Sequence, residues 1–114
     1  MTTSSAFVVG DVVEVEFPYA YPDGEKKRPA LVIAGPNVHS DYTLIMISSR
    51  EQDDGVPIGL ADFASGSLKA ASFARVQRLY TLNGDNVLVH RGRLKLAAVD
   101  RVRAKLCPAL GCRS

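Results

Sequence analysis

The chain has 114 residues, of which 46% are hydrophobic and 23% are charged, and its formal net charge is +2. This length is that of one domain, and the longest apolar runs are only strand-sized, which excludes a membrane-spanning helix. The small net charge hides an asymmetry. Residues 1–57 carry nine acidic and four basic side chains, whereas residues 58–114 carry three acidic and ten basic ones. A basic half of the chain favours binding to a polyanion or to an acidic segment of a partner protein.

The basic side chains of this second half include Arg75, Arg78, Arg91, Arg93, Lys95, Arg101 and Arg103. We expect Arg101, Arg103 and Lys105 to form a solvated helix face. The first five residues have neither the cations nor the apolar core of a signal peptide, which indicates a cytoplasmic protein. We expect a flexible tail over residues 1–9, one domain over 10–108 and a second tail over 109–114.

Residues 13–17 alternate between apolar and acidic side chains, which predicts a half-buried strand. Residues 30–34 are apolar and uncharged, which predicts a strand buried on both faces. The connection between them contains Pro22-Asp23-Gly24, a turn sequence in which Pro presets φ and Gly accepts a positive φ. Because Pro29 lacks an N–H group, we place it at the first residue of the second strand. Arg28 then lies where the loop meets the sheet.

Further along the chain, residues 42–47 are apolar on both faces and predict a central strand. Residues 56–58 contain a proline and predict a short edge strand, whereas the small, polar residues 59–68 predict a loop. Residues 70–76 predict a strand that residues 78–82 continue or replace with a helical turn. Asn83-Gly84 predicts a hairpin whose partner strand is residues 87–89.

The C-terminal part carries a helical stripe at Leu96, Val99, Val102 and Leu106, with Pro108 expected to end the helix. Lys95 precedes it and offers no side-chain cap. Five to seven short strands and one helix predict a mostly β protein, a small antiparallel β-barrel with a C-terminal α-helix.

No metal site or cofactor site is predicted from the sequence. His39 and His90 have no carboxylate or cysteine partners at ligand spacing, and no glycine-rich phosphate loop is present. The two cysteines, Cys107 and Cys112, lack the spacing of a zinc half-site. In a reducing cytosol we expect both to be free thiols.

Several segments together resemble the MazF/PemK family of toxins from toxin–antitoxin pairs. The resemblance begins with Gly10-Asp11-Val12-Val13 and Arg28-Pro29-Ala30-Leu31-Val32, and it continues through Ile47-Ser48-Ser49-Arg50 and Ala71-Ser72-Phe73-Ala74-Arg75. It covers nearly everything from Gly10 to Leu106. It implies an SH3-like barrel and a metal-independent, sequence-selective endoribonuclease of the mRNA interferase type. Its expected partners are single-stranded RNA, an antitoxin with an acidic disordered segment and a second copy of the chain.

The resemblance assigns catalysis to Arg28 and Ser48. A guanidinium matches the fork geometry of a phosphate, and a hydroxyl can donate to a non-bridging oxygen. Because an arginine with a pKa above 12 is a poor base near neutrality, we assign Arg28 mainly to stabilising charge in the transition state. Ser48 stands where the family more often has Thr, and Arg50 where it often has Gln. The candidate RNA contacts are Tyr19, Tyr21, Lys26, Lys27, Ser49, Arg50, Ser72 and Arg75.

Two other hypotheses about the function stay open at this point. One is a non-enzymatic toxin on the same fold, resembling the CcdB-like toxins that bind DNA gyrase. The other is an SH3-like module that binds peptides. The absence of Trp and an aromatic content of 7% argue against an aromatic peptide groove.

Overall fold

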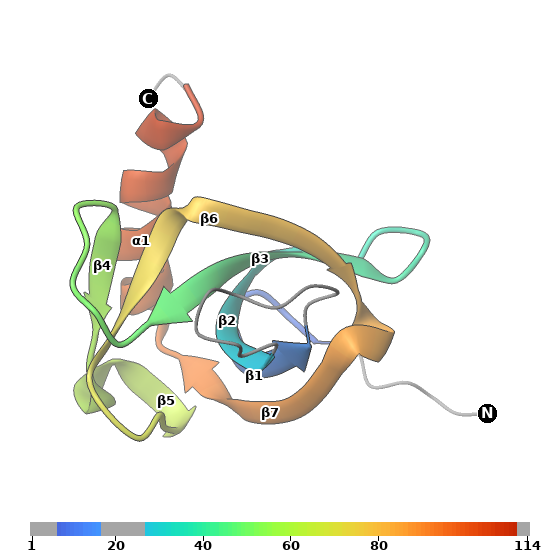
Figure 1. Ribbon diagram of the computed structural model, residues 1–114, viewed down its shortest axis with the longest axis horizontal. Coiled ribbons are helices and arrows are strands. Elements are labelled where there is room, and N and C mark those ends of the chain that lie inside the picture. Colours follow the sequence, from blue (N-terminus) through green and yellow to red (C-terminus); the bar gives the residue numbers. More distant parts are fainter. Residues whose placement is uncertain (1–6, 17–26, 112–114) are drawn as a thin grey trace.

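Seven strands and one helix make up the computed structural model, which describes residues 7–16 and 27–111 (Figure 1). The strands are all antiparallel and lie in one sheet in the order β4-β6-β3-β2-β1-β7-β5. This confirms the mostly β fold with a C-terminal helix. The bounds are β1 Asp11–Glu16, β2 Lys27–Ala34, β3 Asp41–Ser48, β4 Gly55–Ile58, β5 Phe63–Gly66, β6 Ser72–Asn83, β7 Val87–Leu94 and α1 Leu96–Ala109.

The central strands β2 and β3, and the first half of β1, bury both of their faces, because the sheet curls around one set of side chains and α1 covers another. Val12 and Leu31 belong to the cluster that includes α1. Val13 and Val32 belong to a second cluster on the opposite face. Successive side chains of a strand point to opposite faces, so β1 and β2 feed both clusters in turn. The uncharged runs predicted to be buried strands are thus confirmed for β2 and β3.

Strand β2 begins at Lys27, two residues before the expected start at Pro29. Its pairing with β3 begins only at Ala30, which lies opposite Met46. Pro29 precedes the paired segment of β2 and β3, so its missing N–H group breaks no hydrogen bond between these two strands. The turn predicted at Pro22-Asp23-Gly24 lies outside the described residues.

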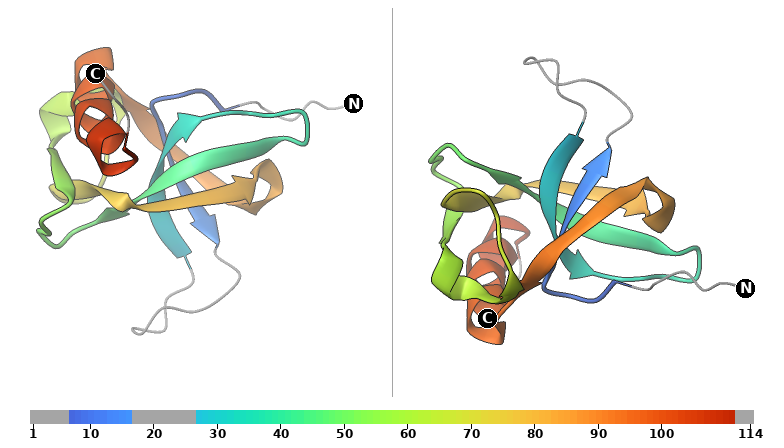
Figure 2. Two further views of the ribbon diagram at one scale, coloured as in Figure 1. Left: turned by 90° about the horizontal axis from the view of Figure 1, so that it is seen from above. Right: turned by 90° about the horizontal axis from the view of Figure 1, so that it is seen from below.

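Helix α1 packs against β6 and β4 at one end of the curled sheet, and the turn between β2 and β3 lies at the other end (Figure 2). It buries Ala98, Val99, Val102 and Leu106. Leu96, which we expected in this stripe, is 71% exposed. Pro108 lies inside the last turn and does not end the helix. Proline is tolerated there because the helix ends one residue later, with its final N–H bonds made by Leu110 and Gly111.

In the second half, two further expectations are corrected, and the strand continuation allowed for residues 78–82 is confirmed. Residues 59–68 are not a plain loop, since they contain a 3₁₀ turn, Leu60–Asp62, and the edge strand β5. Strand β6 runs without interruption to Asn83. Asn83-Gly84 does not make a hairpin, because β6 pairs with β3 and β4 while β7 pairs with β1 and β5. The Asn83 side chain instead accepts a hydrogen bond from the Asp85 N–H and caps the 3₁₀ turn Gly84–Asn86.

The helix cations are exposed but not merely solvated. Arg101 forms an ion pair with Asp62 at 3.1 Å and donates to the Pro57 carbonyl. Lys105 donates to the Asp53 carbonyl at 2.8 Å. These contacts tie α1 to the segment around β4. Cys107 is disulfide-bonded, which contradicts the expected free thiol. The chain has one other cysteine, Cys112, which lies outside the described residues.

Candidate functional site

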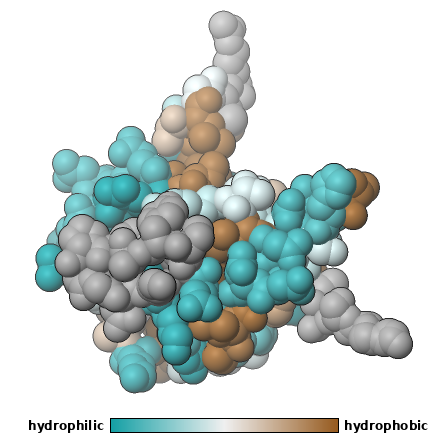
Figure 3. All heavy atoms as spheres, turned by 45° about the vertical axis from the view of Figure 1, so that its right-hand side comes forward, coloured by the Kyte–Doolittle hydropathy of each residue, from teal (hydrophilic) through white to brown (hydrophobic). Residues whose placement is uncertain are grey.

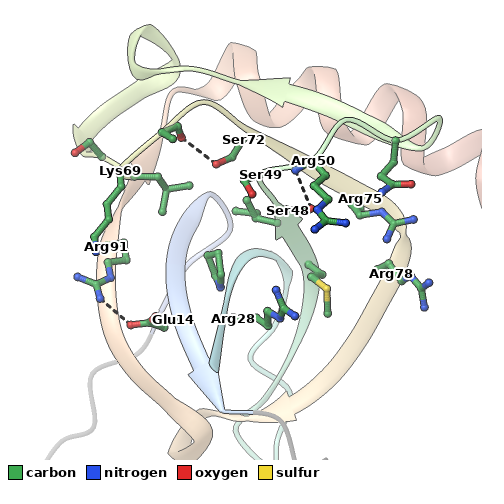
Figure 4. Close-up of a pocket in the computed structure, with 17 residues that line it drawn as sticks. Glu14, Arg28, Ser48, Ser49, Arg50, Lys69, Ser72, Arg75, Arg78 and Arg91 are labelled. Carbon is green, nitrogen blue, oxygen red and sulfur yellow. Dashed lines mark hydrogen bonds and ion pairs between the residues drawn. The ribbon is translucent and has the colours of Figure 1, made fainter. Parts of the chain in front are cut away.

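A pocket of about 1070 Å³ opens where β2 begins and β3 ends (Figure 4). Its walls come from β1, β2, β3, β6 and β7 and from the segments that follow β3 and β5. The lining is strongly basic, with one carboxylate, Glu14, among the described residues that form it. The cations are Arg28, Arg50, Lys69, Arg75, Arg78 and Arg91.

Arg28 and Ser48 lie on neighbouring strands in this pocket. The register pairs Ala30 with Met46. Arg28 and Ser48 each lie two residues beyond this last pair, and both line the pocket. Side chains two residues apart along a strand point to the same face, so a guanidinium and a hydroxyl approach the pocket from adjacent strands. Such a pair can bind one oxyanion between them.

Ser48 is held in place by the chain that follows it. Its Oγ accepts a hydrogen bond from the Arg50 backbone N–H at 3.0 Å. A hydroxyl has two lone pairs and one hydrogen, so this bond leaves the hydrogen able to donate. The bond also fixes the turn after β3, and this turn places Ser49 and Arg50 at the rim of the pocket. Both of these residues are exposed and line the pocket.

Arg75 reaches the opposite wall from β6 and is anchored by Asp54. Its Nε donates to Asp54 Oδ1 at 3.1 Å, and the Gln77 N–H donates to the other carboxylate oxygen, also at 3.1 Å. Burial raises the pKa of Asp54, but the hydrogen bonds from Gln77 and Arg75 outweigh it and hold the pKa below its usual value. Asp54 therefore stays ionised, and it joins the segment before β4 to the arginine of the pocket wall.

At the other side of the pocket, Arg91 on β7 forms an ion pair with Glu14 on β1. The Nη2–Oε1 distance is 2.7 Å, and the two side chains are 44% and 27% exposed. Figure 4 shows Glu14, Arg91 and Lys69 on one side, Arg50, Arg75 and Arg78 on the other, and Arg28 between them. The pocket thus has a side that is only cationic and a side that also offers a carboxylate.

The structure brings six of the predicted site residues into this one pocket: Arg28, Ser48, Ser49, Arg50, Ser72 and Arg75. Ser72 is buried there and donates its hydroxyl to the Ala70 carbonyl. Lys27 is exposed at the start of β2 and is not among the lining residues. Tyr19, Tyr21 and Lys26 lie outside the described residues.

Sequence reasoning did not single out Glu14, Lys69, Arg78 or Arg91 as site residues. For Arg78 and Arg91 the signal was the basic second half of the chain, but nothing in the pattern placed β7 beside β1. Lys69 and Glu14 carried no signal, since a lone charge in a loop or on a half-buried strand is ordinary.

A second polar cluster lies outside the pocket lining. Asp11, only 2% exposed, accepts hydrogen bonds from the Val8 N–H at 2.9 Å and from Arg93 Nε at 2.7 Å, and it lies 3.2 Å from His90 Nε2. Burial raises the pKa of Asp11, but Arg93, the Val8 N–H and His90 together hold that pKa below its usual value. These bonds fasten the start of β1 to β7, so this cluster stabilises the strand that carries Glu14.

The rest of the described surface offers little else. Figure 3 shows hydrophilic side chains over most of one face, with hydrophobic surface in small separate areas. No group of three or more His, Cys, Asp or Glu side chains within residues 7–16 and 27–111 is arranged to hold a metal ion. In the same part of the chain, no helix has the length and apolar character needed to cross a membrane.

The fold and the site together define a small antiparallel β-barrel protein with a basic, hydroxyl-bearing pocket at its strand ends. Residues 9–110 match the family model described as PemK-like, MazF-like toxin of type II toxin–antitoxin system. Because that match covers most of the chain, the protein belongs to the PemK/MazF-like toxin family.

Solved structures share the fold at low sequence identity. A mycobacterial endoribonuclease in complex with its cognate antitoxin is 18% identical with a TM-score of 0.74, covering 97% of this chain and 99% of its own. The Mycobacterium tuberculosis toxin MazF-mt6 is 16% identical with a TM-score of 0.71, covering 91% and 99%. MazF from the MazE–MazF complex of Deinococcus radiodurans is 18% identical with a TM-score of 0.72, covering 96% and 100%. No curated protein matches this chain.

Proposed function

We propose that this protein is the toxin of a toxin–antitoxin pair and acts as an endoribonuclease on single-stranded RNA. The observation that carries the proposal is that Arg28 on β2 and Ser48 on β3 line one basic pocket together. Arg28 and five further cations of the lining suit a polyanionic chain, and their combined field favours its approach. The endoribonuclease structures that share the fold support the same activity.

The cleavage step uses a nucleophile that RNA itself supplies. The 2′-hydroxyl oxygen attacks the adjacent phosphorus while the bond to the 5′ oxygen of the next nucleotide breaks. The products carry a 2′,3′-cyclic phosphate and a 5′-hydroxyl, and the proton lost by the 2′-hydroxyl balances the one gained by the leaving oxygen. Arg28 stabilises the negative charge on the phosphoryl oxygens, and Ser48 donates to one of them. This step requires no metal ion.

We further propose that an antitoxin silences the toxin in the cytoplasm by laying an acidic segment along the same basic pocket. The proposal draws on charge complementarity and on the antitoxin complexes among the structures that share the fold. We also propose a homodimer, as the family resemblance implies. Light scattering on the purified protein measures the mass of the assembly and tests the dimer directly.

The nuclease is tested by incubating the purified protein with a long single-stranded RNA in EDTA and mapping the 5′ ends of the fragments. Wild type should give discrete fragments with 5′-hydroxyl ends. Arg28→Ala and Ser48→Ala should each lower the cleavage rate by roughly two to three decades, the usual effect of removing one charge-stabilising donor. Arg103→Ala is the control, because this exposed cation of α1 lies outside the pocket lining. Intact RNA with folded wild-type protein, over several substrates, would refute the proposal.

A further inference from the structure

We infer that Glu14 and Arg91 form a subsite that binds the Watson–Crick edge of a guanine base in the RNA. The inference rests on the proposed nuclease function and adds a determinant of its sequence preference. The starting observation is the ion pair between these residues, 2.7 Å long, on the wall of a pocket that is otherwise basic.

Stability does not account for Glu14. The pair is exposed, with side chains 44% and 27% accessible, and ion pairs of this kind contribute little to folding. A carboxylate in a pocket that binds a polyanion also repels phosphate. Its presence therefore favours a different group at this side of the pocket, one that carries hydrogen-bond donors rather than negative charge.

The fixed geometry of β1 and β2 separates this side from the phosphate-binding side. Glu14 lies opposite Pro29, and Val15 lies opposite Arg28. Because these register positions are adjacent, the Glu14 and Arg28 side chains leave the strand pair on opposite faces. They both reach the pocket because it lies at the ends of these strands. An RNA chain that presents a phosphate to Arg28 can turn a neighbouring base toward Glu14.

The chemistry of the pair selects among the bases. The Watson–Crick edge of guanine carries two adjacent donors, N1–H and N2–H, beside the acceptor O6. Adenine and cytosine carry one amino group on that edge, and uracil carries one N–H. A carboxylate accepts two parallel hydrogen bonds, and a guanidinium beside it can donate to O6. Glu14 and Arg91 together thus complement guanine, and single-stranded RNA exposes this edge for recognition.

Binding of uncleavable RNA tests the inference apart from the nuclease activity. The probes are fluorescent 2′-O-methyl octamer pools with one fixed central guanosine, inosine or adenosine and flanks randomised over adenosine, cytidine and uridine only, so that no other guanosine is present. Inosine lacks only the N2 amino group of guanosine. Wild type should bind the guanosine pool roughly 10- to 100-fold more tightly than the adenosine pool, the usual discrimination from a bidentate base contact. Inosine should fall between them.

Glu14→Gln should bind the three pools about equally, because an amide cannot accept both guanine donors. Glu16→Gln is the matched control: it removes the same charge from an exposed residue of the same strand. It should keep the wild-type preference. Equal binding of the three pools by wild type, or an unchanged guanosine preference in Glu14→Gln, would overturn the inference. If the wild-type protein prefers the guanosine pool but does not cleave RNA, the proposed nuclease function alone is refuted.

Discussion

Replacement of Asp54 by alanine should lower the free energy of unfolding of the protein. Asp54 is 7% exposed and accepts charge-assisted hydrogen bonds from Arg75 Nε and the Gln77 N–H. Removing bonds of this kind costs about 1.5–3 kcal/mol each, and the arginine retains some access to water. We expect Asp54→Ala to lower the free energy of unfolding by about 3 kcal/mol. For a chain of this length that lowers the Tm by about 12 °C.

Urea unfolding followed by circular dichroism measures this cost, since the chain has no Trp to serve as a fluorescence probe. Asp53→Asn is the matched control, because Asp53 is exposed and uses its backbone carbonyl, not its carboxylate, to bind Lys105. A cost for Asp54→Ala within about 0.5 kcal/mol of that control would refute the reasoning.

The pH dependence gives an independent reading of Asp54. Because the pKa of Asp54 is lower in the folded protein than in the unfolded chain, its contribution is fully present above the unfolded pKa. That contribution is lost as the pH falls below about 5 and through the lowered pKa. Asp54→Asn should therefore flatten the acid limb of the stability profile.

Three other outcomes follow from the structure. Asp11 also has a lowered pKa, so Asp11→Asn should reduce stability at neutral pH by about 2 kcal/mol and have less effect in acid, as urea titrations at two pH values will show. An unchanged stability at both pH values would contradict this. Gly66 has φ +71°, and a Cβ there would collide with the Arg91 carbonyl oxygen, so Gly66→Ala should cost about 2 kcal/mol or more in thermal unfolding. An unshifted Tm would refute that cost. Six cations line the pocket, so the logarithm of RNA affinity should fall with the logarithm of salt with a negative slope of up to about −4. A slope near zero, measured by anisotropy, would show that the pocket does not bind phosphates.

The central strands could be predicted because the types of their residues, which are mostly apolar, indicate burial. An uncharged apolar run such as residues 30–34 can fold stably only where both faces are covered, and it does so in β2. Strand β5 had no such signature, since only Phe63 of its four residues is buried and the others are small and exposed. Edge strands that pair on one side need few apolar residues, and sequence reasoning therefore missed it.

The pairing of the strands was harder to predict than the strands themselves. Asn83-Gly84 is a strong local hairpin signal, yet Asn83 caps a 3₁₀ turn and the strands beside it pair with different neighbours. Burial of the long, curled β6 against β3 outweighs the preference of two residues. The candidate site was hard to predict for the same reason, because it also depends on which strands pair. Arg28 and Ser48 came from a resemblance, but the convergence of Arg91 with Glu14 depends on β7 lying beside β1.

The two-sided burial of β2 and β3 has a consequence for how the pocket can change in evolution. Because most side chains of these strands are committed to the core, the pocket positions that tolerate substitution are exposed ones elsewhere, such as Ser49, Arg50, Lys69 and Arg91. Substitutions at exposed positions of this kind usually change stability by less than about 0.5 kcal/mol. The charge and shape of the pocket wall can therefore vary by mutation with little risk to folding, while Arg28 and Ser48 keep their places near the ends of β2 and β3.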